Sequence, residues 1–189
     1  MFARGFKTWC EKIAAQHRRS LGLQPRDPLD SVSLAASLSI EVHSLGEVPG
    51  LDAVSRHTLL ADSGGWSAVT LTNGTKSVVV LNSAHSAARS ASDLMHELAH
   101  ILIGHKAGRI DITEDGGLIL NTYDRSQEDE ANWLAGCLLL PREALLWILQ
   151  QRLEPDVAAL QYGASLAMFN YRLNVTGVKR QVRSKASRR

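Results

Sequence analysis

The stretch "SASDLMHELAHILIGH", residues Ser90 to His105, sets three histidines and two acids among aliphatic side chains. The Ser-x-x-Asp spacing at its start is typical of a helix N-terminus, and Gly104 is typical of a helix end. These signals predict one helix over residues 91–103. Its apolar content predicts that the helix is buried in the core of the protein.

The polar side chains of this helix fall within a wedge of about 100°, because successive residues turn by about 100°. Burying unpaired polar groups costs about 1–3 kcal/mol each. The wedge therefore needs a compensating ligand or a water-filled cleft, and a divalent cation meets this need. The simpler alternative is a core helix whose histidines hydrogen-bond to their neighbours. The four wedge residues are Asp93, His96, Glu97 and His100.

The spacing within the wedge favours a metal site. His96-Glu97-Leu98-Ala99-His100 is an HExxH motif, in which two histidines four residues apart bind one Zn²⁺ from a single helical face. We therefore predict that His96 and His100 are metal ligands, with zinc as the expected ion and another divalent metal as the alternative.

A third ligand is predicted from "SQEDEANWLAGCLLLP", residues 126–141, a second helix with Ser126 as its N-cap. Glu128 and Asn132 lie four residues apart on one face of this helix. We predict that Glu128 supplies a carboxylate ligand and that Asn132 orients Glu128 or a ligand histidine. The alternative role of Glu128 is to complement the helix dipole.

Two other residues are weaker ligand candidates. Glu130 projects about 200° away from Glu128 around the same helix. His105 follows the helix end, and a third histidine ligand at metzincin spacing requires Gly at position 103 and His at position 106. The chain has Ile103 and Lys106 there. His105 is therefore predicted to be a surface histidine.

Periodicity and turn signals elsewhere predict a mixed structure. Asn73-Gly74 is a dipeptide favoured in tight hairpin turns, and β-rich runs flank it. The order of elements predicts an α+β fold, in which a small, mostly antiparallel sheet packs on the two candidate ligand helices. Helices are predicted at 5–20, after Asp30 or Ser31, at 142–150 and at 156–173, and strands at 40–43, 66–71, 77–82 and 118–120.

Composition places the chain among globular proteins, with 44% hydrophobic and 21% charged residues. No apolar run is long enough to span a bilayer, and the first twenty residues have no apolar core of a signal peptide. The two cysteines, Cys10 and Cys137, are far apart in the sequence and predict free thiols in a reducing compartment. A cytoplasmic protein without a membrane partner is therefore expected.

The two predicted ligand helices together resemble the ImmA/IrrE family of metallo-endopeptidases. That family combines an HExxH helix with the pattern E-x-x-A-N-x-x-A-x-x-L-L-x-P. The segment from Glu128 to Pro141 matches this pattern at every specified position. The similarity covers about residues 30–175.

The resemblance implies roles for matching residues. His96, His100 and Glu128 would be zinc ligands, and Glu97 the catalytic base. The implied substrate is a protein, namely a helix-turn-helix transcriptional repressor; the alternative is an anti-repressor that sequesters such a protein without cleaving it. A second electrophile is also expected, and its candidates are His85, Arg89, His105 and Tyr123.

Four parts of the chain are predicted: an N-terminal helix at 1–25, a zincin-like metalloprotease domain at 26–150, a helical region at 151–178 and a tail at 179–189. The tail holds six basic residues and no acid, which predicts a disordered segment. Such a tail can contact nucleic acid, and residues 156–173 faintly resemble a helix-turn-helix around Gly163. Helix pairs are far more often packing elements, so direct binding to nucleic acid is not expected.

Overall fold

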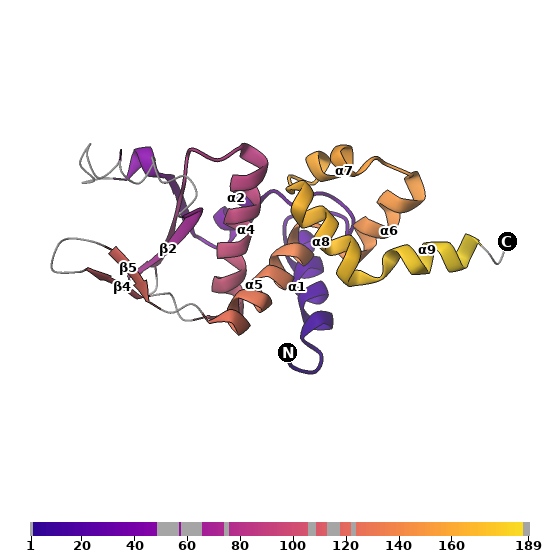
Figure 1. Ribbon diagram of the computed structural model, residues 1–189, viewed down its shortest axis with the longest axis horizontal. Coiled ribbons are helices and arrows are strands. Elements are labelled where there is room, and N and C mark those ends of the chain that lie inside the picture. Colours follow the sequence, from indigo (N-terminus) through magenta and orange to yellow (C-terminus); the bar gives the residue numbers. More distant parts are fainter. Residues whose placement is uncertain are drawn as a thin grey trace.

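The computed structural model confirms the α+β class (Figure 1). It describes residues 2–48, 57, 66–73, 76–105, 109–112, 118–121 and 124–186. The helices are α1 (Phe6–Ser20), α2 (Ser31–Ser37), α4 (Ala87–Ile103), α5 (Arg125–Leu139), α6 (Arg142–Gln151), α7 (Pro155–Gln161), α8 (Leu166–Thr176) and α9 (Val178–Ala186), with a 3₁₀ turn η1 (Leu45–Glu47). The strands are β1 (Glu41–Ser44), β2 (Ala68–Asn73), β3 (Lys76–Leu81), β4 (Arg109–Ile112) and β5 (Leu118–Asn121).

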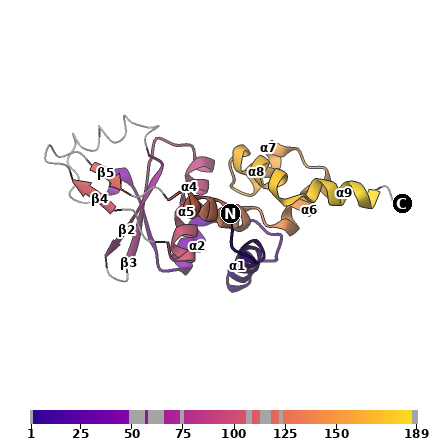
Figure 2. The ribbon, with the colours of Figure 1, turned by 60° about the horizontal axis from the view of Figure 1, so that its bottom comes forward.

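The main sheet has three described strands in the order β1-β3-β2. The predicted hairpin is present, because β2 and β3 pair antiparallel; its turn residue Gly74 lies outside the described residues. β1 pairs with β3 in parallel, so the sheet is mixed. A second, antiparallel pair joins the predicted strand β5 to β4, which the sequence did not reveal. Figure 2 shows the strands on one side of the molecule and α6 to α9 on the other, with α4 and α5 between them.

Helix α4 begins at Ala87, four residues earlier than predicted. Its N-cap is Ser86, whose hydroxyl accepts a hydrogen bond from the Arg89 backbone N–H. The predicted start at Ser90 is wrong, since Asp93 lies inside the helix and contacts His85 instead of capping. The predicted end is confirmed.

The core lies where α4 meets α5 and the sheet. On α4, Leu94, Met95, Leu98 and Ala99 are buried, opposite the predicted polar wedge. On α5, Ala131 and every residue from Trp133 to Leu139 are buried. Because α5 is enclosed along most of its length, the helix is fixed against α4, and its first turn carries Glu128 to that contact.

Both ends of α5 are capped. Its N-cap is Asp124, whose carboxylate accepts from the Ser126 backbone N–H at 2.8 Å, so the predicted cap Ser126 is wrong. Carbonyls at the other end accept hydrogen bonds from two buried arginines. Arg18 Nη2 donates to Leu138 at 2.8 Å, and Arg172 Nε donates to Leu140 at 3.1 Å. These bonds satisfy carbonyls that a helix end leaves unpaired.

Arg172 also donates from Nη2 to the Glu11 carboxylate of α1 at 2.7 Å. Its side chain lies against Gly136, where a Cβ atom would overlap the Arg172 Cδ atom. The glycine therefore makes room for a buried guanidinium that links α1, α5 and α8. Cys10 and Cys137 are buried near this point as free thiols, as predicted.

The C-terminal part differs from the sequence expectation in two places. The helix predicted at 156–173 is broken into α7 and α8 around Gly163, which has a positive φ of 59°. The predicted disordered tail is instead helical as far as Ala186, in α9. Val178 anchors α9 by being fully buried, and Arg142 donates to the Gln181 side chain.

Within the described ranges, no single helix is long and apolar enough to cross a membrane. Helices α5 and α6 reach that length and apolar character only as a pair, and the pair is bent by 52°. The α5 half of the pair is mostly buried inside the protein.

Candidate metal centre

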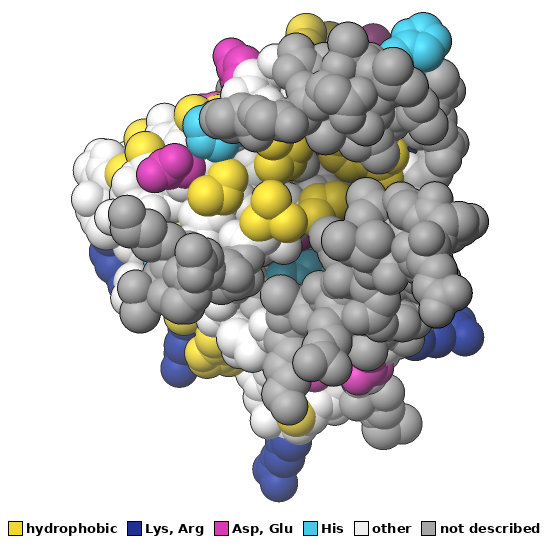
Figure 3. Space-filling view, turned by 90° about the vertical axis from the view of Figure 1, so that its left-hand side faces the viewer, with side chains coloured by type: hydrophobic (Ala, Val, Ile, Leu, Met, Phe, Trp, Pro, Cys, Tyr) yellow, Lys and Arg dark blue, Asp and Glu magenta, His cyan; other side chains and the backbone are white. Residues whose placement is uncertain are grey.

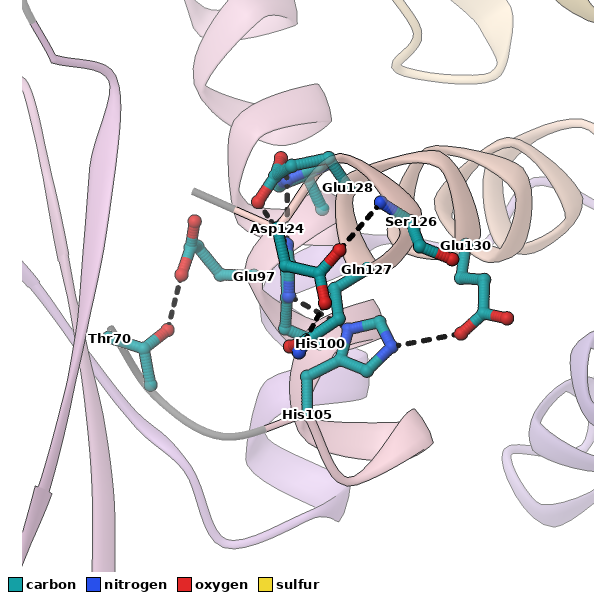
Figure 4. Close-up of polar contacts among 10 residues, drawn as sticks. Thr70, Glu97, His100, His105, Asp124, Ser126, Gln127, Glu128 and Glu130 are labelled. Carbon is teal, nitrogen blue, oxygen red and sulfur yellow. Dashed lines mark hydrogen bonds and ion pairs between the residues drawn. The ribbon is translucent and has the colours of Figure 1, made fainter. Parts of the chain in front are cut away.

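His100 of α4 and Glu128 of α5 lie together where the two helices pack (Figure 4). His96 of α4 belongs to the same cluster. The Nε2 atoms of His96 and His100 are 3.0 Å apart. Glu128 approaches both rings, with Oε2 3.1 Å from His96 Nε2 and Oε1 3.4 Å from His100 Nε2. The structure thus brings together the three residues that the sequence predicted as ligands, on side chains that are 19–30% exposed.

This donor set fits a small divalent cation. One donor atom from each of the three residues lies within 4.8 Å of the others, an arrangement that could hold a metal ion. In tetrahedral zinc with Zn–N bonds of about 2.0–2.1 Å, two ligand nitrogens lie about 3.3 Å apart, close to the observed spacing of the imidazoles. Two histidines and one glutamate are also the protein ligands of one type of catalytic zinc site, which leaves a fourth position open.

His100 is suited to binding a cation through a lone pair. Burial, together with the smaller effect of the neighbouring His96 and His105 rings, lowers the pKa of His100 to about 4. The ring is therefore neutral at neutral pH, and a neutral imidazole is the form that binds metals.

Glu97 lies beside the ligand trio and faces the sheet (Figure 4). Its carboxylate accepts a hydrogen bond of 2.5 Å from the Thr70 hydroxyl of β2. Burial raises the pKa of Glu97, while the Thr70 hydrogen bond opposes the rise by favouring the ionised form. The sequence did not indicate Thr70. Its position depends on pairing opposite the buried Val79 of β3, which no local pattern reveals.

His105 is not the predicted surface histidine, because its side chain is only 7% exposed. Its Nδ1 atom lies 2.9 Å from His100 Nδ1, and its Nε2 atom lies 3.2 Å from Glu130 Oε2. Glu130, the weaker ligand candidate, therefore contacts His105 rather than the ligand trio. Gly104 followed by His105 was a readable signal, since the residue after a left-handed helix cap folds back towards the helix.

The other predicted site residues lie elsewhere. Asn132 is exposed on α5, and the expectation that it orients Glu128 or a ligand histidine stays a prediction. His85 and Arg89 both contact Asp93, one turn before Glu97 on α4, at 3.1 Å and 3.8 Å. Tyr123 lies outside the described residues. The second electrophile remains a prediction.

Residues 56–174 match the family model Peptidase_M78, described as the IrrE N-terminal-like domain. The match covers more than half of the chain and includes both helices that carry the ligand trio. It confirms the family resemblance found in the two sequence motifs. A search of curated proteins finds no match.

Proposed function

Because the chain belongs to the IrrE N-terminal-like family of peptidases, we propose that it is a zinc-dependent endopeptidase. The observation that carries the proposal is the convergence of His96, His100 and Glu128. Glu97 adds an acid–base group beside them, on the same helix. A ligand trio with one open position and an adjacent carboxylate is what metal-assisted peptide hydrolysis requires.

The bound metal would act as a Lewis acid that polarises the scissile carbonyl and makes water more acidic. Glu97 takes one proton from the attacking water, whose oxygen bonds to the carbonyl carbon. The same carboxyl group then passes this proton to the amide nitrogen as the C–N bond breaks, which leaves a carboxylic acid and an amine. Thr70 holds the Glu97 carboxylate in place during both transfers.

The sheet offers a place for an extended substrate. β2 is an outer strand of the described three-stranded sheet, and it carries Thr70, which contacts Glu97. A substrate segment that pairs with this edge as an added strand would lie beside the catalytic group. On the face that carries the strands, apolar side chains gather beside a recessed histidine (Figure 3). Such a surface suits the side chains of a peptide.

We further propose that the substrate is a helix-turn-helix transcriptional repressor. The choice of a repressor as substrate is supported by the resemblance of the two sequence motifs to the ImmA/IrrE family. The site geometry supports peptide hydrolysis.

The test compares cleavage by the wild-type chain and by Glu97→Gln. Zinc-loaded proteins are incubated with a purified repressor, and the products are identified by mass spectrometry. We expect Glu97→Gln to retain zinc and to cleave at least about 100-fold more slowly, since a general base contributes about 10²–10⁴-fold. Glu143→Gln is the matched control, because Glu143 is exposed on α6. Its rate should equal that of the wild type.

Two outcomes would contradict parts of the proposal. Cleavage by Glu97→Gln at the wild-type rate would remove Glu97 from its assigned role. A zinc-loaded wild-type chain that binds the repressor firmly and leaves it intact would support the anti-repressor alternative.

A further inference from the structure

His105 and Glu130 form a partly buried pair on the far side of His100 from Glu128, and the peptidase mechanism above does not use this pair. His105 Nδ1 lies 2.9 Å from His100 Nδ1, on the side of the His100 ring away from Glu128. His105 Nε2 lies 3.2 Å from Glu130 Oε2. Figure 4 shows the His105 ring between α4 and the Glu130 carboxylate of α5.

The end of α4 explains how His105 reaches the His100 ring. Gly104 adopts the left-handed conformation with φ of 81°, and its N–H bonds to the carbonyls of His100 and Ile101. The His105 N–H bonds to the His100 carbonyl at 3.0 Å. A backbone hydrogen bond between residues five positions apart is typical of a Schellman motif, which brings the residue after the glycine against the last turn of the helix. Here the two residues in contact are imidazoles, with ring centroids 4.9 Å apart.

The direction of each hydrogen bond follows from the Glu130 carboxylate. An ionised carboxylate only accepts hydrogen bonds, so His105 Nε2 is the donor to Glu130. A neutral imidazole has one N–H, and its other nitrogen is an acceptor. His105 Nδ1 therefore accepts, and the N–H of His100 Nδ1 donates to it. This order leaves His100 Nε2 with a free lone pair, facing His96 and Glu128.

We propose that His105 and Glu130 are positioning residues that fix the tautomer and the orientation of His100 for metal binding. The inference rests on the proposed function, because it assigns the two residues a role towards the proposed zinc ion. If the hydrogen-bond directions were reversed, His105 Nδ1 would donate to His100 Nδ1. The hydrogen of the His100 ring would then lie on Nε2, where it blocks a bond to the metal. Glu130 excludes that order by requiring the hydrogen on His105 Nε2.

The test measures zinc affinity by competition with a chromophoric chelator, using the full chain after metal removal. His105→Leu removes both hydrogen bonds, and we expect zinc to bind about 10- to 100-fold more weakly. Glu130→Leu removes the acceptor that fixes the tautomers of His105 and His100, so it should also weaken zinc binding. His105→Asn places an amide oxygen near the position of Nδ1, so it should recover much of the affinity. Asp129→Asn is the control, because Asp129 is exposed on the same helix as Glu130.

A second readout is independent of affinity. In nitrogen-15 spectra of the zinc-loaded wild type, the His100 Nδ1–H proton should exchange slowly with water, since His105 accepts it. In His105→Leu this proton should exchange faster. Unfolding by urea in the presence of a chelator checks that each variant is folded. Should His105→Leu fail to fold, Glu130→Leu carries the test, because the Glu130 side chain is 24% exposed.

The outcomes separate this inference from the proposed function. A wild-type chain that binds no zinc would contradict the proposed function. A wild-type chain that binds zinc, together with folded His105→Leu or Glu130→Leu variants of equal affinity, would overturn the positioning role alone.

Discussion

The Thr70 hydroxyl on β2 donates a hydrogen bond of 2.5 Å to the Glu97 carboxylate on α4. This bond joins the sheet to the helix that carries both candidate histidine ligands. Glu97 is thus oriented by a strand residue that precedes it by 27 positions. The sheet therefore has a direct part in the candidate active site.

Replacing Thr70 by Val should slow peptide cleavage while zinc content stays unchanged. A hydrogen bond to a charged group contributes about 1.5–3 kcal/mol, which corresponds to about 10- to 100-fold in rate if it is lost in the transition state. Thr70→Ser keeps the hydroxyl and should retain most of the activity. Steady-state kinetics and metal analysis of both variants check the prediction, and equal rates for Val and wild type would contradict it.

Replacing Glu128 by Gln should weaken zinc binding. The variant keeps the size of the side chain and loses the carboxylate that approaches both imidazoles. We expect at least about a 10-fold loss of zinc affinity, since the loss of a ligand should exceed the effect of a residue that only supports one. Asp129→Asn is the control, because Asp129 is the neighbouring exposed acid on α5. Similar zinc affinities for the two variants would show that Glu128 is not a ligand.

Acid should destabilise the metal-free protein through His100. Its pKa is about 4 in the folded chain and about 6.5 in the unfolded chain. Between these values the unfolded chain binds a proton that the folded chain does not, so the free energy of unfolding falls as the pH is lowered from about 6.5 to about 4. Urea unfolding with a chelator present, at several pH values, measures this slope. His100→Asn should have a shallower slope, and parallel slopes would contradict the assignment.

Glu11→Ala should destabilise the fold without touching the metal centre. Glu11 is the carboxylate partner of Arg172, which is fully buried, and it also accepts from the Arg142 backbone N–H at 3.0 Å. Its removal leaves a buried guanidinium unpaired, at a cost of about 3–5 kcal/mol. Lys12→Ala, at an exposed position on the same helix, should change stability by less than about 0.5 kcal/mol. Comparable unfolding midpoints would show that water replaces Glu11 as the partner of Arg172.

Local patterns predicted the parts of the site that depend on helix periodicity. The wedge of α4 and the Glu128 face of α5 follow from spacings of three and four residues, so both could be read from the sequence. The α+β class followed in the same way, from the order of periodic segments. Zinc binding by these residues remains a prediction.

Some features of the structure were not predicted because they depend on contacts between residues far apart in the sequence. Helix and strand periodicity does not reveal such contacts. Thr70 reaches Glu97 only because β2 pairs with β3 and the sheet packs on α4. The parallel pairing of β1 is likewise a long-range contact. The prediction that His105 is a surface histidine is wrong for a different reason. Gly104 predicts the end of the helix, but the same left-handed glycine also returns the next residue to the helix.

The two arginines that cap the end of α5 belong to opposite ends of the sequence, Arg18 in α1 and Arg172 in α8. On the ribosome, α8 emerges only after the HExxH helix and Glu128 have been made. A nascent chain arrested before residue 172 lacks the Arg172 hydrogen bond to the end of α5, so we expect Glu128, the third predicted ligand, to be held less firmly. We expect the proposed peptidase activity to arise only after α8 has been made.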